Sequence, residues 1–254
     1  MKIAVFTGAS SGMGREFVHQ ITQTEKFDEI WVIARRVDRL EELKSEVDVP
    51  VRCLGLDLTK HESIEEYKRL LEKENPEVAV LVNASGYGKF GAFTDLGLEE
   101  QLGMVDLNSK ALVAITYVTA PFLKSGSKVY QVDSLSSFQP VPYISVYGAT
   151  KAFVLNFTRA VNAEWRHKGV KMMAVCPGWV KTEFFDTAVV DDSVITYYNQ
   201  FFTPKQVVSR ALRDMKKGKD VSVCGWKIRV QVFFTKLLPH KLVMKIWLKQ
   251  QGKK

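Results

Sequence analysis

Short apolar runs alternate with longer amphipathic segments along most of this chain. Runs rich in β-branched residues predict buried strands at residues 3–6, 29–33, 51–56, 78–82, 128–132 and 170–175. The helical spacing of apolar residues predicts helices at residues 14–23, 39–46, 63–74, 98–123 and 147–167. This alternation predicts an α/β fold, namely a Rossmann-type doubly wound parallel sheet with helices on both faces.

The pattern shows no sign of a domain boundary. Of the 254 residues, 46% are hydrophobic, which is enough for a core on both sides of a large sheet. Neither an internal repeat nor a low-complexity linker interrupts the alternation. Residues 1–254 are therefore predicted to form a single domain, with ligands bound beyond the carboxyl ends of the strands.

Composition argues against several classes of protein. The three cysteines (Cys53, Cys176 and Cys224) and the four histidines are too scattered for a disulfide framework or a metal site. The apolar run after Met1 ends at Thr7-Gly8, which is too early for a signal peptide. No run approaches the roughly 20 apolar residues that cross a bilayer. These features predict a cytoplasmic protein without a metal.

The net charge of +8 is concentrated near the C-terminus. Residues 205–254 contain 14 Lys and Arg against 2 Asp and Glu, whereas the rest of the chain contains 22 and 26. Residues 226–254 form a basic extension that is too apolar for a solvated helix. Burial against protein is the favoured interpretation, and peripheral contact with a membrane surface is the alternative. No nucleic acid partner is expected, because no groove-reading motif is present.

A glycine-rich turn, Thr7-Gly8-Ala9-Ser10-Ser11-Gly12-Met13-Gly14, joins the first predicted strand to the first helix. Glycines allow the backbone to turn tightly and approach a diphosphate, and the N–H groups that begin the helix bind phosphate oxygens. An ordinary strand-to-helix turn is the alternative. In this position the motif predicts a dinucleotide site formed by Gly8, Ser10, Ser11, Gly12, Met13 and Gly14.

The end of the second strand indicates which dinucleotide binds. An NAD enzyme places an acidic residue on the ribose 2′-hydroxyl, about twenty residues beyond the last glycine. Here the strand ends in Arg35-Arg36, whose guanidinium groups suit a 2′-phosphate. The pair favours NADP(H), with Arg35 the first candidate and Arg36 the second. Two solvated surface arginines are the alternative.

Tyr147 and Lys151 lie four residues apart on one face of a predicted helix, a spacing that is common by itself. Several other motifs stand with this pair in order and in register: residues 7–14, Asn83-Ala84-Ser85-Gly86, Asn108, Ser134 and Pro177-Gly178-Trp179-Val180-Lys181-Thr182. Together they resemble the short-chain dehydrogenase/reductase family from residue 3 to about residue 182.

The resemblance implies a catalytic tetrad of Asn108, Ser134, Tyr147 and Lys151. Tyr147 would exchange a proton with the substrate oxygen once its pKa fell from about 10 toward neutrality, and Lys151 would favour the phenolate. Lys151 would also bind the nicotinamide ribose. Ser134 would orient the substrate oxygen, and Asn108 would hold a water between Lys151 and solvent. Taken singly, Ser134 and Asn108 also fit local structural hydrogen bonds.

The resemblance also implies cofactor contacts outside the glycine-rich turn: Asp57, Leu58, Asn83, Ala84, Ser85, Gly86, Tyr147, Lys151, Pro177, Gly178, Val180 and Thr182. The chain departs from the family pattern at two places. Asn83-Ala84-Ser85-Gly86 stands where Asn-Asn-Ala-Gly is usual, and Asp133 precedes Ser134 where a serine is frequent. Strand alternation predicts that the Asp133 side chain points away from Ser134.

By the same resemblance, residues 183–203 cover the substrate. This segment contains Phe184, Phe185, Val189, Val190, Ile195, Tyr197, Tyr198, Phe201 and Phe202, and the expected flanking walls contain Phe90, Phe93, Phe138 and Tyr143. A pocket with such a lining suits a bulky apolar ketone or alcohol that is steroid-, lipid- or acyl-like. Packing of a lid helix is the alternative use for many of these side chains.

The sequence therefore predicts an NADP(H)-dependent oxidoreductase that transfers hydride between nicotinamide and a carbonyl or secondary alcohol. The family likeness implies a homodimer or homotetramer. One alternative is a catalytically silent NADP(H)-binding regulatory protein, which would have no need of a proton donor beside Lys151. Another is a reductase of lipophilic ketones that associates with the membrane surface.

Overall fold

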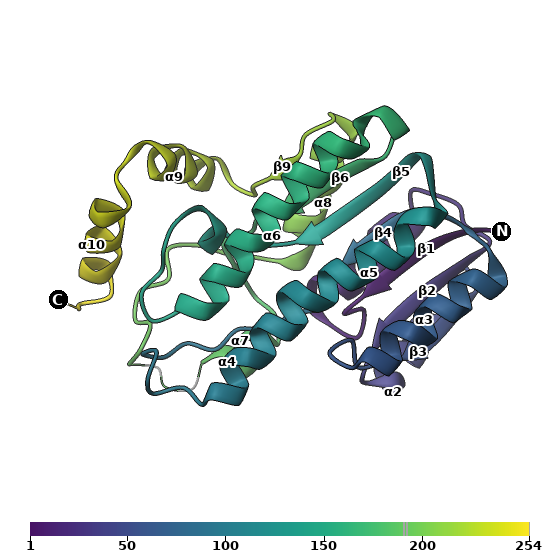
Figure 1. Cartoon of the computed structure of the whole chain (residues 1–254). Coiled ribbons are helices and arrows are strands. Elements are labelled where there is room, and N and C mark those ends of the chain that lie inside the picture. Colours follow the sequence, from purple (N-terminus) through teal and green to yellow (C-terminus); the bar gives the residue numbers. More distant parts are fainter. Residues whose placement is uncertain (190, 192, 254) are drawn as a thin grey trace.

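The computed structural model describes residues 1–189, 191 and 193–253 (Figure 1). Its main sheet has seven parallel strands in the order β3-β2-β1-β4-β5-β6-β9. The strands are β1 (Lys2–Thr7), β2 (Glu29–Ala34), β3 (Val51–Gly55), β4 (Glu77–Asn83), β5 (Leu123–Val132), β6 (Lys171–Val175) and β9 (Val221–Ser222). Because the strand order reverses between β1 and β4, the sheet is doubly wound, and the predicted fold class is confirmed.

All six predicted strands are present, because each supplies the apolar side chains that a sheet covered on both faces must bury. The sequence pattern does not predict β9, a two-residue strand at the edge of the sheet beside β6. A strand this short produces no apolar run.

The helices are α1 (Gly12–Thr22), α2 (Val37–Glu41), α3 (His61–Glu74), α4 (Leu98–Val105), α5 (Leu112–Thr119), α6 (Ser145–Glu164), α7 (Phe184–Ala188), α8 (Pro204–Lys216), α9 (Trp226–Leu237) and α10 (His240–Gln250). The helices that cover the sheet form two layers, and α3, α5 and α6 lie in front of the sheet in Figure 1. Ala4 and Phe6 of β1 pack in one core with residues of α1 and α8. Ile3 and Val5 pack in the other core with residues of α3 and α5.

The predicted helix at residues 98–123 is one helical stretch with an irregular middle. A π-helical turn, Asp106–Ala111, separates α4 from α5, and a 3₁₀ turn, Ala120–Phe122, ends the stretch. The prediction for Leu123 is wrong, because this residue begins β5 and pairs with Val78. π-helical turns often occur at functional sites, and this one contains Asn108.

The chain after β6 closes the carboxyl end of the sheet. Two short strands, β7 (Trp179–Val180) and β8 (Phe201–Phe202), pair in parallel and bring the two ends of the segment 183–203 together. Helix α10 is tied to this segment because the Gln251 side chain accepts hydrogen bonds from Thr196 N and Tyr197 N at 2.8 and 3.0 Å. Val190 of the predicted pocket lies outside the described residues.

Helices α9 and α10 project from one end of the molecule in Figure 1. Among the described residues, none of the helices combines the length and the apolar character that a bilayer crossing requires.

Candidate active site

One large cavity of about 1180 Å³ lies beyond the carboxyl ends of the central strands. Its walls include the glycine-rich turn after β1, the end of β2, the turn after β4, the end of β5, the first turn of α6 and the segment after β6. Of the predicted site residues, the cavity brings together Gly8, Ser10, Ser11, Gly12, Met13, Gly14, Arg35, Arg36, Asp57, Leu58, Ala84, Ser85, Gly86, Ser134, Tyr147, Lys151, Pro177, Gly178, Val180 and Thr182.

The glycine-rich turn has a shape that side chains would prevent. Gly8 has φ +66°, and a Cβ atom there would lie 2.7 Å from the Ala84 backbone. A Cβ atom on Gly14 would overlap the Gly8 carbonyl oxygen. Ser11 begins α1 without a side-chain cap, and the first turn has no acidic residue. The first N–H groups of α1 are thus available to an anion, so the turn fits a dinucleotide diphosphate.

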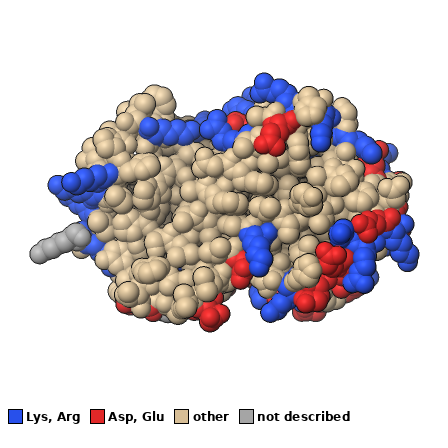
Figure 2. Space-filling view, in the orientation of Figure 1, with Lys and Arg blue, Asp and Glu red and all other residues tan. Residues whose placement is uncertain are grey.

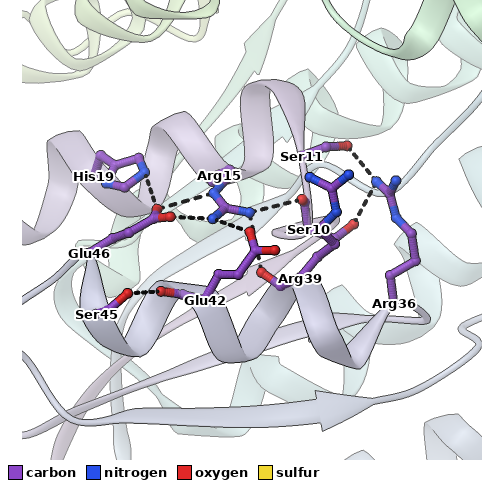
Figure 3. Close-up of polar contacts among 9 residues, drawn as sticks. All are labelled: Ser10, Ser11, Arg15, His19, Arg36, Arg39, Glu42, Ser45 and Glu46. Atoms are coloured by element: carbon purple, nitrogen blue, oxygen red, sulfur yellow. Dashed lines mark hydrogen bonds and ion pairs between the residues drawn. The ribbon is translucent and has the colours of Figure 1, made fainter.

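Arg36 lies over this turn (Figure 3). Its Nη2 donates to Ser11 Oγ at 2.9 Å and to Ser10 Oγ at 3.2 Å. Its Nη1 also pairs with Glu183 Oε2 at 2.9 Å, but both side chains are nearly half exposed, so this ion pair is weak. Arg39 points toward the same turn, although the sequence reasoning does not select it. Its position three residues after Arg36, in the middle of the short helix α2, is the signal that could have identified it.

Arg35 differs from Arg36 in its neighbours. It is exposed, lines the cavity and lies near Asp57, whose pKa is lowered: burial opposes this shift, while hydrogen bonds from Thr59 and the charge of Arg35 favour it. Thr59 N and Oγ1 both donate to Asp57 Oδ1, at 3.1 and 2.7 Å. The geometry therefore gives Arg36, rather than the first candidate Arg35, the contacts with the glycine-rich turn.

Arg15 holds α2 against α1 on the outer side of the same turn. It bridges Glu42, at 2.8 Å, and Glu46, and its Nη1 donates to Ser10 O at 3.4 Å (Figure 3). Because Glu42 and Glu46 belong to the turns that follow α2, these contacts fix Arg36 and Arg39 relative to the start of α1.

Asn83, one of the expected cofactor contacts, does not line the cavity. Its Nδ2 donates to Thr116 Oγ1 at 3.1 Å on the α5 side of the sheet, where the side chain is 3% exposed. The turn that follows is held instead by Thr7 Oγ1, which accepts from Ala84 N at 3.1 Å and from Ser85 N at 3.2 Å. Asn83 is therefore a structural residue of β4.

Asn108 is also outside the cavity wall and completely buried. Its Oδ1 accepts from Tyr87 N at 3.0 Å, and its Nδ2 donates to Tyr87 O at 2.9 Å and to Thr150 Oγ1 at 3.1 Å. The side chain thus ties the turn after β4 to α6. A Cβ atom on Gly86 would lie 2.9 Å from Asn108 Oδ1, so the turn must have glycine there to approach so closely.

Ser134, Tyr147 and Lys151 meet between the end of β5 and the start of α6. Lys151 Nζ donates to Val132 O at 2.9 Å and lies 5.6 Å from the centre of the Tyr147 ring. Ser134 caps a short 3₁₀ turn, where its Oγ accepts from Ser136 N at 3.2 Å. The Tyr147 ring packs against Phe184, with ring centres 5.6 Å apart.

The protonation of Tyr147 differs from the expectation. Burial raises the pKa of Tyr147, a hydrogen bond with Ser134 lowers it, and the charge of Asp133 raises it. The expected lowering of this pKa by Lys151, whose ammonium group donates to Val132 O, is not seen in this structure. The pKa of Lys151 is itself lowered by burial, an effect that Asp133 opposes. The phenol is therefore held in its protonated form at neutral pH.

Asp133 is buried beside this cluster, and its charge acts on both Tyr147 and Lys151. It is 2% exposed, and its Oδ2 accepts from Cys176 Sγ at 3.3 Å. Burial raises the pKa of Asp133 to about 7, although the charge of Lys151 lowers it. A buried carboxyl group whose pKa is raised to about 7 thus lies beside Tyr147 and Lys151.

The remaining walls of the cavity are mainly apolar. Phe184 and Phe185 line it as predicted, together with Phe90, Phe138 and Tyr197. In contrast, Ile195 and Phe202 are buried in the cores, Phe201 is outside the wall, and Phe93 is 63% exposed.

Three aromatic side chains of the wall are not among those that the sequence assigns to the pocket, namely Tyr87, Trp179 and Trp247. Trp247 comes from α10, and its Nε1 donates to Pro142 O at 3.1 Å. The apolar pattern of residues 239–254 could have indicated this burial, but not its location. The C-terminal extension is thus partly buried against protein, as favoured, and forms part of the cavity.

Comparison with known proteins agrees with this geometry. The family model described as short chain dehydrogenase matches residues 2–192. The NADP-dependent 3-hydroxy acid dehydrogenase of Schizosaccharomyces pombe is 32% identical over 190 residues, which are 72% of this chain and 73% of that protein. An oxidoreductase of Staphylococcus epidermidis is 30% identical over 183 residues, 71% of this chain and 79% of that one.

A solved structure is similar over most of the chain. It is a short-chain dehydrogenase from Sphingobium yanoikuyae in complex with NADPH, with a TM-score of 0.78 and 28% sequence identity. The match covers 88% of this chain and 87% of that one.

Proposed function

This chain belongs to the short chain dehydrogenase family, and from that premise we propose that it is an NADP(H)-dependent oxidoreductase. It transfers hydride between nicotinamide and the carbonyl or secondary alcohol carbon of a bulky apolar substrate. The observation that carries the proposal is a single cavity that contains both the phosphate-binding turn and the Ser134–Tyr147–Lys151 cluster. A cofactor and a substrate therefore have room to meet beside a proton donor.

Several features support NADP(H) as the cofactor. The uncapped start of α1 accepts the diphosphate, and Arg36 and Arg39 provide positive charge over the same turn, where a 2′-phosphate needs it. The relative from S. pombe is named as NADP-dependent, and the similar structure from S. yanoikuyae contains NADPH. When bound, the nicotinamide supplies or accepts the hydride.

Tyr147 is proposed as the group that donates a proton to the substrate oxygen. Burial keeps its hydroxyl protonated, which is the form that donates to the oxygen of a carbonyl substrate during reduction. Ser134 Oγ orients the same substrate oxygen by a hydrogen bond, and Lys151 binds the nicotinamide ribose. Asn108 acts indirectly, because its hydrogen bonds position the turn after β4 and the start of α6.

The apolar walls favour a bulky apolar substrate. Phe90, Phe184, Phe185 and Trp179 form a connected aromatic cluster beside Tyr147. A site of this kind binds through buried apolar area and leaves only the reacting oxygen to polar groups. A panel of apolar ketones of increasing size, followed by NADPH oxidation, would show whether kcat/KM rises with the apolar area.

The decisive experiment is Tyr147→Phe. We expect turnover to fall at least about a hundredfold, since general acid catalysis contributes this much, while the NADPH dissociation constant changes by only a few fold. Tyr117→Phe, at a tyrosine 79% exposed on α5, makes the same chemical change away from the cavity and should leave turnover unchanged. Turnover that survives in Tyr147→Phe would disprove the assignment of the acid.

The same measurements test the alternative that the chain is a catalytically silent NADP(H)-binding regulatory protein. Such a protein would bind NADPH but oxidise it with no ketone of the panel, and Tyr147→Phe would change nothing.

A homodimer or homotetramer is proposed as the assembly. Leu98, Leu102 and Val105 form an exposed apolar stripe along α4, and Phe153 is 45% exposed on α6. Apolar stripes of this kind are usually covered by another protein surface. Sedimentation velocity of Leu102→Glu, compared with the unmutated protein, would test whether these helices form the contact.

A further inference from the structure

The two C-terminal helices expose a set of large apolar side chains, which we term the α9–α10 surface. On α9 these are Trp226, Val230, Phe233, Phe234 and Leu237, and on α10 they are Leu242 and Ile246. The spacing on α9 places its members on one helical face. Trp226 and Leu237 are each 65% exposed, and Phe233 is 59% exposed. A monomeric protein rarely leaves so continuous an apolar face in water.

The exposure is a consequence of how the helices are anchored. Ile228, Val232 and Thr235 on the other side of α9 are buried, and so is Val243 of α10. Ile228 and Val232 belong to the core beneath the sheet. The buried side chains therefore determine which face of α9 points outward.

The charged residues of the same two helices are all basic. Residues 226–254 contain eight Lys and Arg and no Asp or Glu. Among the residues that the structure describes, no acidic side chain forms an ion pair with a Lys or Arg of α9 or α10. On the face drawn in Figure 2, Lys and Arg side chains lie at the end of the molecule where these helices project.

We propose that the α9–α10 surface docks on an anionic lipid bilayer. The apolar side chains of α9 enter the interface, and lysines such as Lys241, Lys245 and Lys249, one helical turn apart, contact the lipid headgroups. Helices of 12 and 11 residues are too short to cross a bilayer, so they lie on it.

Charge distinguishes this partner from a second copy of the chain. A two-fold contact through the α9–α10 surface would bring two groups of like charges together without a carboxylate between them. An anionic bilayer satisfies both properties of the surface, because it offers negative headgroups and an apolar interior next to them.

Docking would also place the active-site cavity beside the lipid, an extension that rests on the proposed function. Val232 and Thr235 of α9 and Trp247 and Gln250 of α10 line that cavity. A lipophilic ketone dissolved in the bilayer would therefore reach the site along the two helices.

Flotation of the full-length protein with vesicles tests the docking independently of catalysis. We expect binding to phosphatidylcholine vesicles that contain about 30% phosphatidylglycerol, and little binding to phosphatidylcholine alone. Each lysine near such a surface strengthens binding about fivefold, so Lys241→Glu/Lys245→Glu/Lys249→Glu should weaken it at least about a hundredfold. Phe233→Ser/Phe234→Ser should also weaken binding to the anionic vesicles.

Two matched controls separate the surface from general effects. Lys124→Glu/Lys168→Glu/Lys217→Glu changes the net charge equally at exposed lysines elsewhere, and Tyr117→Ser removes an exposed aromatic ring of α5. Both should bind vesicles as the unmutated protein does. NADPH binding by every variant shows that it is folded.

Three results would overturn the proposal. The first is no flotation of the unmutated protein with anionic vesicles, and the second is an equal loss in the two triple-lysine variants. The third is a pair of observations: the unmutated protein does not bind vesicles, and Phe233→Ser/Phe234→Ser changes the oligomeric state. This result would show that the α9–α10 surface contacts a second copy of the chain. If vesicle binding holds but no ketone is reduced, the docking stands and the proposed function fails.

Discussion

The buried carboxyl group of Asp133 makes a quantitative prediction about stability. Its pKa rises from an ordinary 3.8 to about 7 because burial disfavours the charged form. Between these two pH values the unfolded chain releases the proton while the folded chain keeps it. The free energy of unfolding therefore falls as the pH rises through this window and levels off above about pH 7.

The shift sets the size of the effect. A change of one pKa unit corresponds to about 1.4 kcal/mol, so Asp133 destabilises the fold by at most about 4 kcal/mol at pH 8 and by about 2 kcal/mol at pH 5. These are upper values, because the Asp133 charge also stabilises the Lys151 ammonium group. Asp133→Asn should thus be more stable than the parent, and the gain should be larger at pH 8 than at pH 5.

Urea unfolding followed by circular dichroism from pH 5 to pH 8 measures this difference. Asp214→Asn is the matched control, because Asp214 is an equally buried carboxylate with the opposite shift. Burial raises the pKa of Asp214, but hydrogen bonds from Arg210, Lys219 and Ser222 outweigh this and leave it lowered. Asp214 therefore stabilises the fold above its unfolded pKa, and Asp214→Asn should lose stability most at pH 8.

Two results would contradict the raised pKa of Asp133: an Asp133→Asn variant no more stable than the parent at pH 8, or one whose stability has the same pH dependence as the parent between pH 5 and pH 8. Either result would mean that the carboxyl group is not held uncharged by burial.

Three further predictions concern the site. The unmutated protein should bind NADPH at least about tenfold more tightly than NADH, and Arg36→Ala should remove about tenfold of this preference. Fluorescence titration of both cofactors should show a smaller effect for Arg35→Ala, and the reverse order would contradict the contacts of Arg36 with the phosphate-binding turn. Asn108→Ala removes three buried hydrogen bonds, to Tyr87 and Thr150, and should lower the free energy of unfolding by about 2–3 kcal/mol in urea titrations. An unchanged urea midpoint would show that these bonds contribute nothing.

Asp133→Asn also has a kinetic consequence, which a pH profile would detect. Removing the charge lowers the pKa of Tyr147, so the kcat/KM profile for alcohol oxidation should move to lower pH. A profile that stays in place would show that Asp133 does not act on the phenol.

The local sequence determined the strands, most of the helices and the order of the motifs. Buried parallel strands need apolar β-branched runs, so the pattern of residues 3–175 leaves little choice about the fold. The glycine-rich turn was equally clear, since Gly8 and Gly14 stand where any side chain would overlap backbone. These features depend on residues close together in the chain.

Features that depend on contacts between distant segments came only from the tertiary structure. Asn108 lies in a π-helical turn and bonds to Tyr87 and Thr150, which are far from it in sequence, so no local periodicity reveals that role. Arg35 and Arg36 are adjacent and chemically identical, and only packing against the first turn of α1 separates them.

The pKa of Asp133 and the exposed face of residues 226–254 were also determined only by the tertiary structure. The pKa of Asp133 depends on how completely β5, β6 and α6 exclude water, which composition does not express. Residues 226–254 are apolar on several sides, so the pattern could not tell which side chains enter the core and which face outward. Both properties are set by burial, and burial is a property of the assembled fold.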